Sequence, residues 1–199
     1  MHILIGNQAP HFEAKAVVKG KIVDDFSLAN YQGKFVLLLF YPLDFTFVCP
    51  TELIAFEEAK HLFSQRNCEL IAISVDSPNC HLAWLNTPRS KGGIEGITYP
   101  LISDMTRHIS KQYGVLKEDE AIAYRGLFLI DTEGIVRHQL INDLPLGRSC
   151  KEALRILDAL IYFEQNGEVC PANWESGQRA ITPTLEGLED FFAHTPSLS

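Results

Sequence analysis

The chain has 199 residues, of which 46% are hydrophobic and 21% charged, which predicts a globular protein with one sizeable core and excludes a disordered or collagen-like chain. Lysine and arginine number 17 against 25 aspartates and glutamates, so the formal net charge is -8, and a chain of this charge repels the phosphate backbone of nucleic acids. The longest apolar run, Phe35 to Tyr41, is far below the ~20 residues of a membrane span. The first residues lack the basic start and apolar stretch of a signal peptide, so we expect a cytoplasmic protein with no nucleic-acid or membrane partner.

The first elements predicted along the chain are a hairpin, a central strand and a helix. Residues 11–28 alternate weakly between polar and apolar on either side of a Lys-Gly pair, as a β-hairpin does. Residues 34–41 form a continuous apolar run, typical of a strand covered on both faces, and Pro42 ends it. Apolar residues three or four apart then predict a helix over 50–66. Cys49 is therefore expected where a loop meets the start of a helix.

The strand-helix alternation continues. Residues 69–75 read as a strand, a short helix should carry Leu82 and Trp84, and Asp104 is predicted to be the N-cap of a helix that ends at Gly114. Because strands that alternate with helices usually run in one direction, we expect a largely parallel sheet.

A second hairpin and a long helix follow. Residues 126–130 and 135–141 are apolar runs joined by a turn too short for a crossover, so they should pair antiparallel. Ser149 and Glu152 form a capping box, after which the apolar periodicity predicts a helix to about Phe163.

The character of the sequence changes after this helix. Residues 165–187 are rich in glycine, proline and polar side chains, which predicts an extended arm before a short helix over 188–192. We therefore divide the chain into a domain over 1–164 and a C-terminal arm over 165–199. The order of elements is similar to an α/β thioredoxin-like fold with an N-terminal β-hairpin and an extended C-terminal arm.

Five cysteines are scattered along the chain. An odd, dispersed set argues against a small secreted disulfide framework and for reduced thiols, some of them reactive. They are Cys49, Cys68, Cys80, Cys150 and Cys170.

Cys49 has the position of a reactive thiol. A thiol reacts as its thiolate, and an unperturbed cysteine, with a pKa of about 8.5, is only a few per cent ionised at neutral pH. A helix start stabilises an anion by roughly 0.3 to 1 kcal/mol, whereas lowering a pKa to about 6 takes about 3 kcal/mol. We therefore expect a cation, most naturally an arginine, beside Cys49. The alternative, a small buried hydrophobic side chain, is disfavoured by its position at a helix start among polar residues.

The residues after Cys49 exclude one chemistry. A thiol-disulfide oxidoreductase of this fold needs Cys-x-x-Cys, but Cys49-Pro-Thr ends in Glu52. A lone nucleophile that turns over through a disulfide needs a distant partner, and Cys170, in the arm, is the most mobile candidate.

These residues resemble a known family. The segment from Pro42 to Glu52, PLDFTFVCPTE, resembles the P-x-x-x-T-x-x-C segment of peroxiredoxins, and Val169-Cys170-Pro171 resembles the resolving segment of their typical 2-Cys subgroup, which includes alkyl hydroperoxide reductase C subunits and thioredoxin peroxidases. The resemblance covers roughly Gly6 to Trp174. Further matching segments are SVDS at 74–77, HLAW at 81–84, NTPR at 86–89, YRG at 124–126 and NDLPLGRS at 142–149.

The resemblance implies a role for each matching residue around the thiol. Cys49 would be the peroxidatic cysteine that attacks the peroxide, with Arg125 as the cation beside it. Thr46 would orient the peroxide and the sulfur, and Pro42 would shield the sulfur from water. From the residues alone, Thr46 is also explained as a turn residue and Pro42 as a strand stop.

The remaining roles concern charge and turnover. Glu52 would hold the first arginine, and Arg148 would add positive charge where the leaving oxygen becomes anionic. The sulfenic acid formed on Cys49 would condense with Cys170 into a disulfide between two subunits. Without the family, both arginines read as surface side chains, and Glu52 as an acid favoured by the helix dipole.

The implied function is a thiol-dependent peroxidase that reduces hydrogen peroxide and alkyl hydroperoxides. Its minimal unit would be a homodimer, commonly assembled as a ring of five dimers, and thioredoxin or a dedicated flavoprotein disulfide reductase would recycle it. The sequence contains no metal, haem or nucleotide motif, so no cofactor is expected. The alternatives from other classes are a holdase chaperone and a peroxide-sensing redox relay.

The other three cysteines are expected to be structural. Cys68 introduces a buried strand, and Cys80 adjoins only one histidine, His81, where a zinc site needs more ligands. Cys150 follows a predicted N-cap and matches no family role.

Two departures from the family pattern concern a second oxidation by peroxide. Members that are easily inactivated carry a Gly-Gly-Leu-Gly segment and a Tyr-Phe pair in the C-terminal helix. This chain has Gly92-Gly93-Ile94-Glu95 and Phe191-Phe192 instead, so we expect comparative resistance to overoxidation.

Overall fold

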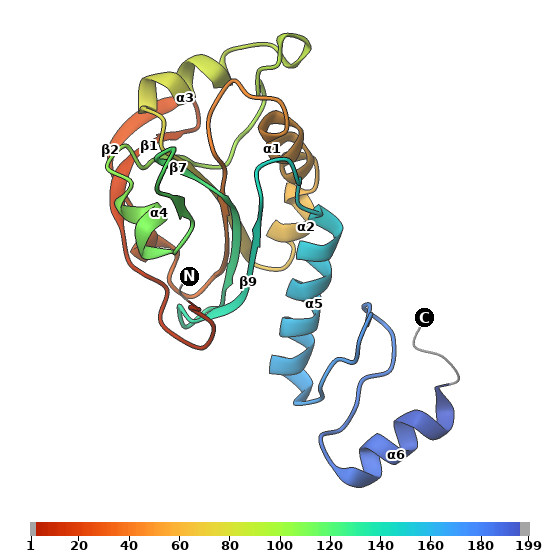
Figure 1. Cartoon of the computed structure of the whole chain (residues 1–199). Coiled ribbons are helices and arrows are strands. Elements are labelled where there is room, and N and C mark those ends of the chain that lie inside the picture. Colours follow the sequence, from red (N-terminus) through yellow and green to blue (C-terminus); the bar gives the residue numbers. More distant parts are fainter. Residues whose placement is uncertain (1–2, 196–199) are drawn as a thin grey trace. The chain divides into compact units, whose positions relative to one another are not determined.

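The computed structural model describes residues 3–195 and contains two compact units, Met1–Cys150 and Lys151–Ser199 (Figure 1). The sequence suggested a division between residues 164 and 165. The structure groups the long helix that precedes this point with the C-terminal arm.

The first unit is built on a seven-stranded sheet in the order β2-β1-β5-β4-β3-β8-β9. Its strands are β1 (Glu13–Val18), β2 (Lys21–Ser27), β3 (Phe35–Phe40), β4 (Cys68–Ser74), β5 (Leu101–Ser103), β8 (Arg125–Ile130) and β9 (Val136–Asn142). A separate pair joins β6 (Leu116–Lys117) to β7 (Ile122–Ala123). The two predicted hairpins are confirmed as β1-β2 and β8-β9, both antiparallel.

The prediction of a largely parallel sheet is wrong. Only the pairs β3-β4 and β4-β5 are parallel, because β3 also pairs antiparallel with β8 and the N-terminal hairpin joins β5 antiparallel. Crossover helices connect β3 to β4 and β4 to β5, whereas hairpin turns build the two edges. The result is a mixed α/β sheet with β3 near its centre.

The helices of the first unit differ from the sequence prediction at two places. The helix expected over 50–66 is two helices, α1 (Cys49–Glu58) and α2 (Lys60–Ser64). They are separated at Ala59, whose φ of -89° stays in the right-handed region while its ψ of 0° departs from the roughly -42° of a regular α-helix. The helix expected after Asp104 is α4 (His108–Gln112), whose N-cap is Arg107. The Asp104 carboxylate nevertheless binds the start of α4, accepting bonds from the backbone N–H groups of Ile109 and Ser110.

The other helical segments of this unit are short. The helix predicted around Leu82 and Trp84 is α3 (Pro78–Leu85), capped by the Ser77 hydroxyl. Two single turns of 3-10 helix, η1 (Leu28–Tyr31) and η2 (Arg89–Lys91), complete the unit.

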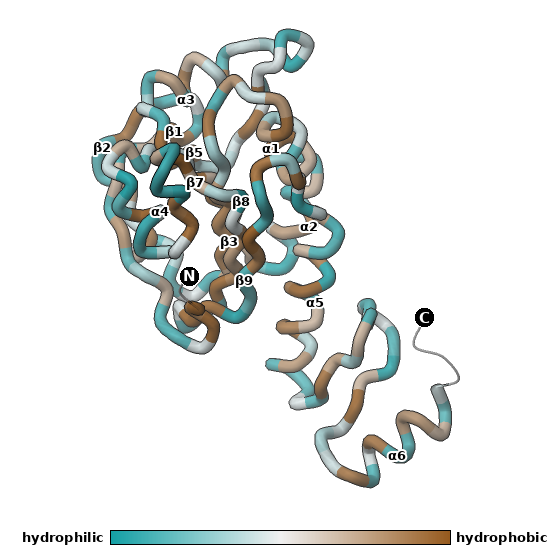
Figure 2. Tube along the Cα trace, in the orientation of Figure 1, coloured by the Kyte–Doolittle hydropathy of each residue, from teal (hydrophilic) through white to brown (hydrophobic). Residues whose placement is uncertain are grey.

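The core explains why β3 is central. All six side chains of its sequence, FVLLLF, are apolar and buried (Figure 2). Val36, Leu38 and Phe40 face one hydrophobic cluster that includes Tyr113 just after α4 and Phe128 of β8. On the other face, α2 packs against β4. Burial on both faces fixes the end of β3 and hence the start of the loop that leads to Cys49.

The second unit consists of α5 (Cys150–Asn166), an extended arm and α6 (Leu185–His194). Both helices are longer than the sequence predicted. The arm is closed on itself by an antiparallel bridge between Val169 and Ile181. Within residues 3–195, no helix combines the length and the hydrophobicity that crossing a membrane requires.

Candidate active site

Cys49 is the first residue of α1, as the sequence predicted, and its side chain is completely buried. The loop from Tyr41 to Val48 leads to it from the end of β3. Pro50 occupies the first turn, where its missing N–H costs nothing, and no side chain caps the helix. The free N–H groups at the start of α1 therefore favour negative charge near the Cys49 sulfur.

Arg125, the first residue of β8, brings a guanidinium group to this sulfur. Its Nη1 atom lies 3.4 Å from Sγ of Cys49 and 2.7 Å from Oε2 of Glu52, and its Nε donates to the carbonyl of Leu144 at 2.6 Å. The side chain is 3% exposed, so it is not an ordinary surface arginine. The cation expected from the sequence is therefore present.

Glu52, one turn into α1, joins this arginine to a second one. The Nε and the backbone N–H of Arg148 both donate to Oε1 of Glu52 at 2.8 Å, and Nη2 donates to Oε2 at 3.1 Å. Burial by itself would raise the pKa of the Glu52 carboxyl, but the hydrogen bonds and charge of Arg148, with the charge of Arg125, hold that pKa below its usual value. Glu52 is thus an anion that fixes two buried guanidinium groups.

The hydrogen bonds of Arg148 add a structural contribution to the positive charge that the family resemblance implied. Besides Glu52, its Nη1 donates to the carbonyls of Phe40 and Gly126. These bonds tie the last residue of β3 to the second residue of β8. Arg148 therefore holds Glu52 and the strand ends in place.

Thr46 and Pro42 both lie in the loop before α1. The Thr46 hydroxyl donates to the carbonyl of Leu43 at 2.9 Å, which is the turn-stabilising bond that the residue type suggested. Since its proton is engaged, the oxygen is left with acceptor capacity for a substrate hydroxyl. Pro42 is buried two residues after the end of β3.

Residues that no sequence pattern predicted anchor this loop. Asp44, which is 6% exposed, accepts a bond from the Tyr41 hydroxyl at 2.8 Å, and its Oδ2 lies 2.8 Å from Nδ1 of His81. Its backbone N–H donates to Oδ2 of Asp76 at 2.9 Å, and the Ser74 hydroxyl donates to the same oxygen at 2.7 Å. The loop before Cys49 is therefore fastened to the end of β4, the parallel neighbour of β3.

The same anchor contains three side chains of types that bind metals. Oxygen and sulfur atoms of Asp44, Asp76 and Cys80 lie within 4.8 Å of one another, the one such cluster among residues 3–195. Because Asp44 already binds Tyr41 and His81, and Asp76 accepts a bond from Ser74, we assign the cluster to holding the loop.

The remaining thiols have surroundings that disfavour ionisation. Burial raises the pKa of Cys150 to about 11, and burial together with the carboxylates of Asp44 and Asp76 raises that of Cys80 to about 12. Burial also raises the pKa of Cys68, at the start of β4. These values agree with the structural roles that the sequence suggested.

Cys170 lies in the second unit, where its Sγ donates to the carbonyl of Ala159 in α5 at 3.6 Å. All five cysteines are free thiols in this structure.

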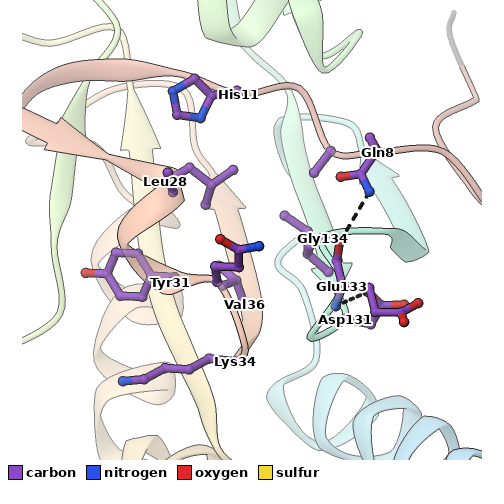
Figure 3. A pocket seen from close by; sticks show the side chains of 13 residues that line it. Gln8, His11, Leu28, Tyr31, Lys34, Val36, Asp131, Glu133 and Gly134 are labelled. Atoms are coloured by element: carbon purple, nitrogen blue, oxygen red, sulfur yellow. Dashed lines mark hydrogen bonds between the residues drawn. The ribbon is translucent and has the colours of Figure 1, made fainter.

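A cavity of about 200 Å³, whose lining side chains Figure 3 shows, lies beside the first residues of β3, at the opposite end of this strand from the loop that leads to Cys49. Its lining includes His11, Tyr31, Lys34 and the Gln8 amide, which donates to the carbonyl of Glu133. No thiol lines it. The reactive geometry of the first unit is therefore concentrated at the start of α1.

Comparison with known proteins covers both units. Residues 5–139 match the model of the AhpC/TSA family, and residues 159–194 match that of the C-terminal domain of 1-Cys peroxiredoxin. The chain is 52% identical to peroxiredoxin-2 of Bos taurus over 189 residues, covering 95% of this chain and 94% of the relative. It is 51% identical to the thioredoxin peroxidase of Echinococcus granulosus over 193 residues, covering 97% of this chain and 100% of the relative.

Solved structures show the same relationship. The reduced 2-Cys peroxiredoxin of Plasmodium vivax superposes with a TM-score of 0.93 at 47% identity, covering 96% of this chain and 100% of that one. The AhpC of Enterococcus faecalis gives a TM-score of 0.79 at 34% identity, covering 85% of this chain and 100% of that one. Together with the buried Cys49-Arg125 contact at the start of a helix, these matches identify the chain as a member of the AhpC/TSA family, a thioredoxin-like peroxiredoxin that reduces peroxides with thiols.

Proposed function

We propose that Cys49 is the peroxidatic cysteine and Cys170 the resolving cysteine of this peroxidase. The observation that carries the first assignment is the 3.4 Å contact between Nη1 of Arg125 and Sγ of Cys49 at the uncapped start of α1. A guanidinium ion and the free N–H groups of a helix start together stabilise a thiolate. None of the other four cysteines combines these two features. The substrates are hydrogen peroxide and small alkyl hydroperoxides.

The first chemical step is a displacement at oxygen. The Cys49 thiolate attacks the terminal oxygen of the peroxide, an S–O bond forms as the O–O bond breaks, and the leaving oxygen takes a proton to become water or an alcohol. Arg125 stabilises the charge as it moves from sulfur to the leaving oxygen, and the Thr46 oxygen accepts a hydrogen bond from the substrate hydroxyl. Pro42 shields the sulfur from water. Arg148 acts through Glu52, which holds Arg125 in place.

The second step forms a disulfide. The thiolate of Cys170 attacks the sulfur of the Cys49 sulfenic acid, the S–S bond forms as the S–O bond breaks, and the leaving hydroxide takes up the thiol's proton to become water. We place the partner cysteine on a second subunit, so that the working unit is a homodimer, assembled as a ring of five dimers. A Plasmodium yoelii relative modified at its N-terminus is described as forming an artifactual octamer, so that modified protein associates beyond a dimer.

Turnover requires an external reductant for the disulfide. We propose thioredoxin, since one relative is named a thioredoxin peroxidase, with a dedicated flavoprotein disulfide reductase as the alternative. We place the reaction in the cytoplasm, where such reductants keep thiols reduced. The residues 165–199 form the arm that carries Cys170 to its partner.

The decisive experiment is peroxide consumption by Cys49→Ser and Cys170→Ser variants, with Cys150→Ser as the matched control. We expect Cys49→Ser to lose all turnover, and Cys170→Ser to lose turnover with thioredoxin while it keeps single-turnover oxidation of Cys49. Cys150→Ser should resemble the wild type. Substantial thioredoxin-linked turnover by Cys170→Ser would contradict the proposed resolving role.

The same variants separate the enzyme from a chaperone or a redox relay. A holdase would keep unfolded clients soluble after Cys49→Ser and would consume little peroxide as the wild type. A relay would pass its disulfide to a protein target faster than to thioredoxin.

A further inference from the structure

The arm that carries Cys170 is fixed along one face of α5 by three contacts. Arg155, Ala159 and Tyr162 are spaced four and three residues apart, so they share a helix face. At the N-terminal end of this face, Nη1 of Arg155 donates to the carbonyl of Trp174 at 3.1 Å. In the middle, Sγ of Cys170 donates to the carbonyl of Ala159. At the C-terminal end, the Tyr162 hydroxyl donates to Oε2 of Glu168 at 2.6 Å.

This arrangement places the Cys170 thiol between opposite charges. Arg155, which carries the guanidinium group, lies one helical turn before Ala159. The Glu168 carboxylate is bound to Tyr162, about one turn after Ala159. Both groups are held firmly, because Glu152 binds Arg155 through two bonds of 2.7 and 2.8 Å and Tyr162 fixes Glu168. The rings of Tyr162 and Trp174 also pack against each other, with their centroids 5.0 Å apart, and this contact adds to those between α5 and the arm.

The two charges act on the thiol in opposite directions. Burial raises the pKa of Cys170, the charge of Arg155 lowers it, and the charge of Glu168 raises it. The charged and titratable groups that face this cluster within the second unit are Arg155, Glu152 and Tyr162 from α5, and Glu168 and Glu175 from the arm.

We propose that Arg155 and Glu168 are opposing positioning residues that set the rate at which Cys170 resolves the sulfenic acid. This inference rests on the proposed role of Cys170 and adds the residues that control it. Only the thiolate of Cys170 attacks the sulfenic sulfur, and the hydroxide that leaves takes up the proton that the thiol has lost, so the step needs no further reactant. Arg155 promotes this ionisation and Glu168 restrains it.

The size of the effect follows from thiol chemistry. If the pKa of the thiol rises by about one unit, the fraction of thiolate at neutral pH falls about tenfold. The more basic thiolate is also a better nucleophile, with a Brønsted coefficient of about 0.5, so the net rate falls only about threefold. Arg155→Gln should slow disulfide formation at neutral pH by about this factor, and Glu168→Gln should accelerate it by a similar factor. Neither change should affect the oxidation of Cys49 by peroxide, because both residues act on Cys170.

The test measures Cys170 directly. In a Cys49→Ser background, the rate of Cys170 alkylation by iodoacetamide is followed by peptide mass spectrometry from about pH 6 to 10. We expect Arg155→Gln to move the profile to higher pH and Glu168→Gln to move it to lower pH, with Arg155→Lys close to the unsubstituted background. Lys151→Gln and Glu186→Gln, which remove exposed charges elsewhere in the unit, should leave the profile in place.

Opposite shifts support the proposal, because a general loosening of the arm would move both profiles in the same direction. Unchanged profiles, or shifts of the same sign, would overturn it. Disulfide formation in the presence of Cys49 is then timed by rapid quench after one equivalent of peroxide. If the Cys170→Ser variant still turns over with thioredoxin, the proposed function fails; if it does not, and the charge variants have no effect, only this inference fails.

Discussion

Both carboxylate oxygens of Glu52 are bound by Arg148, whose side-chain and backbone donors lie 2.8 to 3.1 Å from them in a fully buried environment. The second oxygen also accepts the bond from Arg125 that positions this arginine beside Cys49. A single carboxylate therefore neutralises part of the charge of two buried guanidinium groups and connects α1 to β8 and to the segment after β9.

Replacing Glu52 by Gln should destabilise the fold. The substitution preserves size but leaves two buried cations without a counter-charge, and breaking a buried pair in this way costs about 3 to 5 kcal/mol. Urea unfolding with excess reductant measures the loss. Glu58→Gln on the same helix is the control, because the Arg89-Glu58 pair is exposed and such pairs contribute about 0 to 1 kcal/mol. Equal losses for the two variants would contradict the central role of Glu52.

The stabilisation by Glu52 should depend on pH with a defined sign. The folded-state pKa of this carboxyl is lower than its ordinary value of 4.5, so its contribution is fully present above that value and is lost as the pH falls through the lower folded value. The difference in unfolding free energy between the wild type and Glu52→Gln should therefore be constant from about pH 8 to 5 and shrink below that range. Urea titrations at five pH values measure it, and a difference unchanged at pH 3 would contradict the prediction.

Arg125 should not be replaceable by lysine. Its planar group donates to the Leu144 carbonyl, to Glu52 and to the Cys49 sulfur at once, and a single ammonium group cannot reproduce this geometry. By analogy with the loss of one preorganised donor, we expect Arg125→Lys to slow Cys49 oxidation by about 100-fold in stopped-flow measurements. Arg137→Lys, on β9 and 40% exposed in its side chain, is the matched control and should retain the wild-type rate. Oxidation by Arg125→Lys within about threefold of the wild type would count against the assignment.

The sequence predicted those parts of the molecule whose signal is local. The apolar run of β3, the turn between β1 and β2, and the position of Cys49 at a helix start each depend on neighbouring residues, and the structure confirms them. The break at Ala59 was missed because the apolar periodicity continues across it. The direction of β8 beside β3 was missed because pairing between distant strands leaves no local pattern.

The site shows the same limit. Arg125 is 76 residues from Cys49, and only the family resemblance connected them. The bond between Asp44 and His81 joins positions 37 residues apart, and a lone aspartate in a loop carries no periodic signal. The only signal in the sequence is the set of matching segments around Ser74 to Asp76 and His81, whose side chains bind the Asp44 segment in the structure.

The three structural thiols should resist alkylation at neutral pH. With pKa values raised to about 12 for Cys80 and about 11 for Cys150, and a higher value still for Cys68, these thiols remain protonated. In a Cys49→Ser/Cys170→Ser variant, iodoacetamide should label Cys80 and Cys150 slowly at pH 7.5 and faster as the pH approaches 10, as read by peptide mass spectrometry. Asp76→Asn should speed the labelling of Cys80 and leave that of Cys150 unchanged, since Asp76 is one of the charges that restrain Cys80. Rapid labelling of Cys80 at pH 7.5 would show that its surroundings favour the thiolate instead.

Resistance to overoxidation should depend on the segment around Gly93. A Cβ at Gly93 would lie 1.9 Å from the Thr87 carbonyl oxygen, so this glycine is required by packing, whereas Ile94 is buried and Glu95 is exposed. The resemblance to sensitive relatives, which carry Gly-Gly-Leu-Gly here, implies that a double change, Ile94→Leu with Glu95→Gly, makes the chain more sensitive. Combined with Phe191→Tyr, it should increase the fraction of Cys49 found as sulfinic acid, about 32 Da heavier than the thiol, after graded peroxide with a thiol reductant.

The wild type should require more peroxide than the combined variant to reach the same sulfinic fraction, because a less firmly covered Cys49 is captured by Cys170 before a second peroxide reacts. Glu118→Gln, an exposed change between β6 and β7, serves as the control and should not alter the dose. Conversion of wild-type Cys49 at modest peroxide, equal to that of the combined variant, would show that these two segments do not control the competition between resolution and overoxidation.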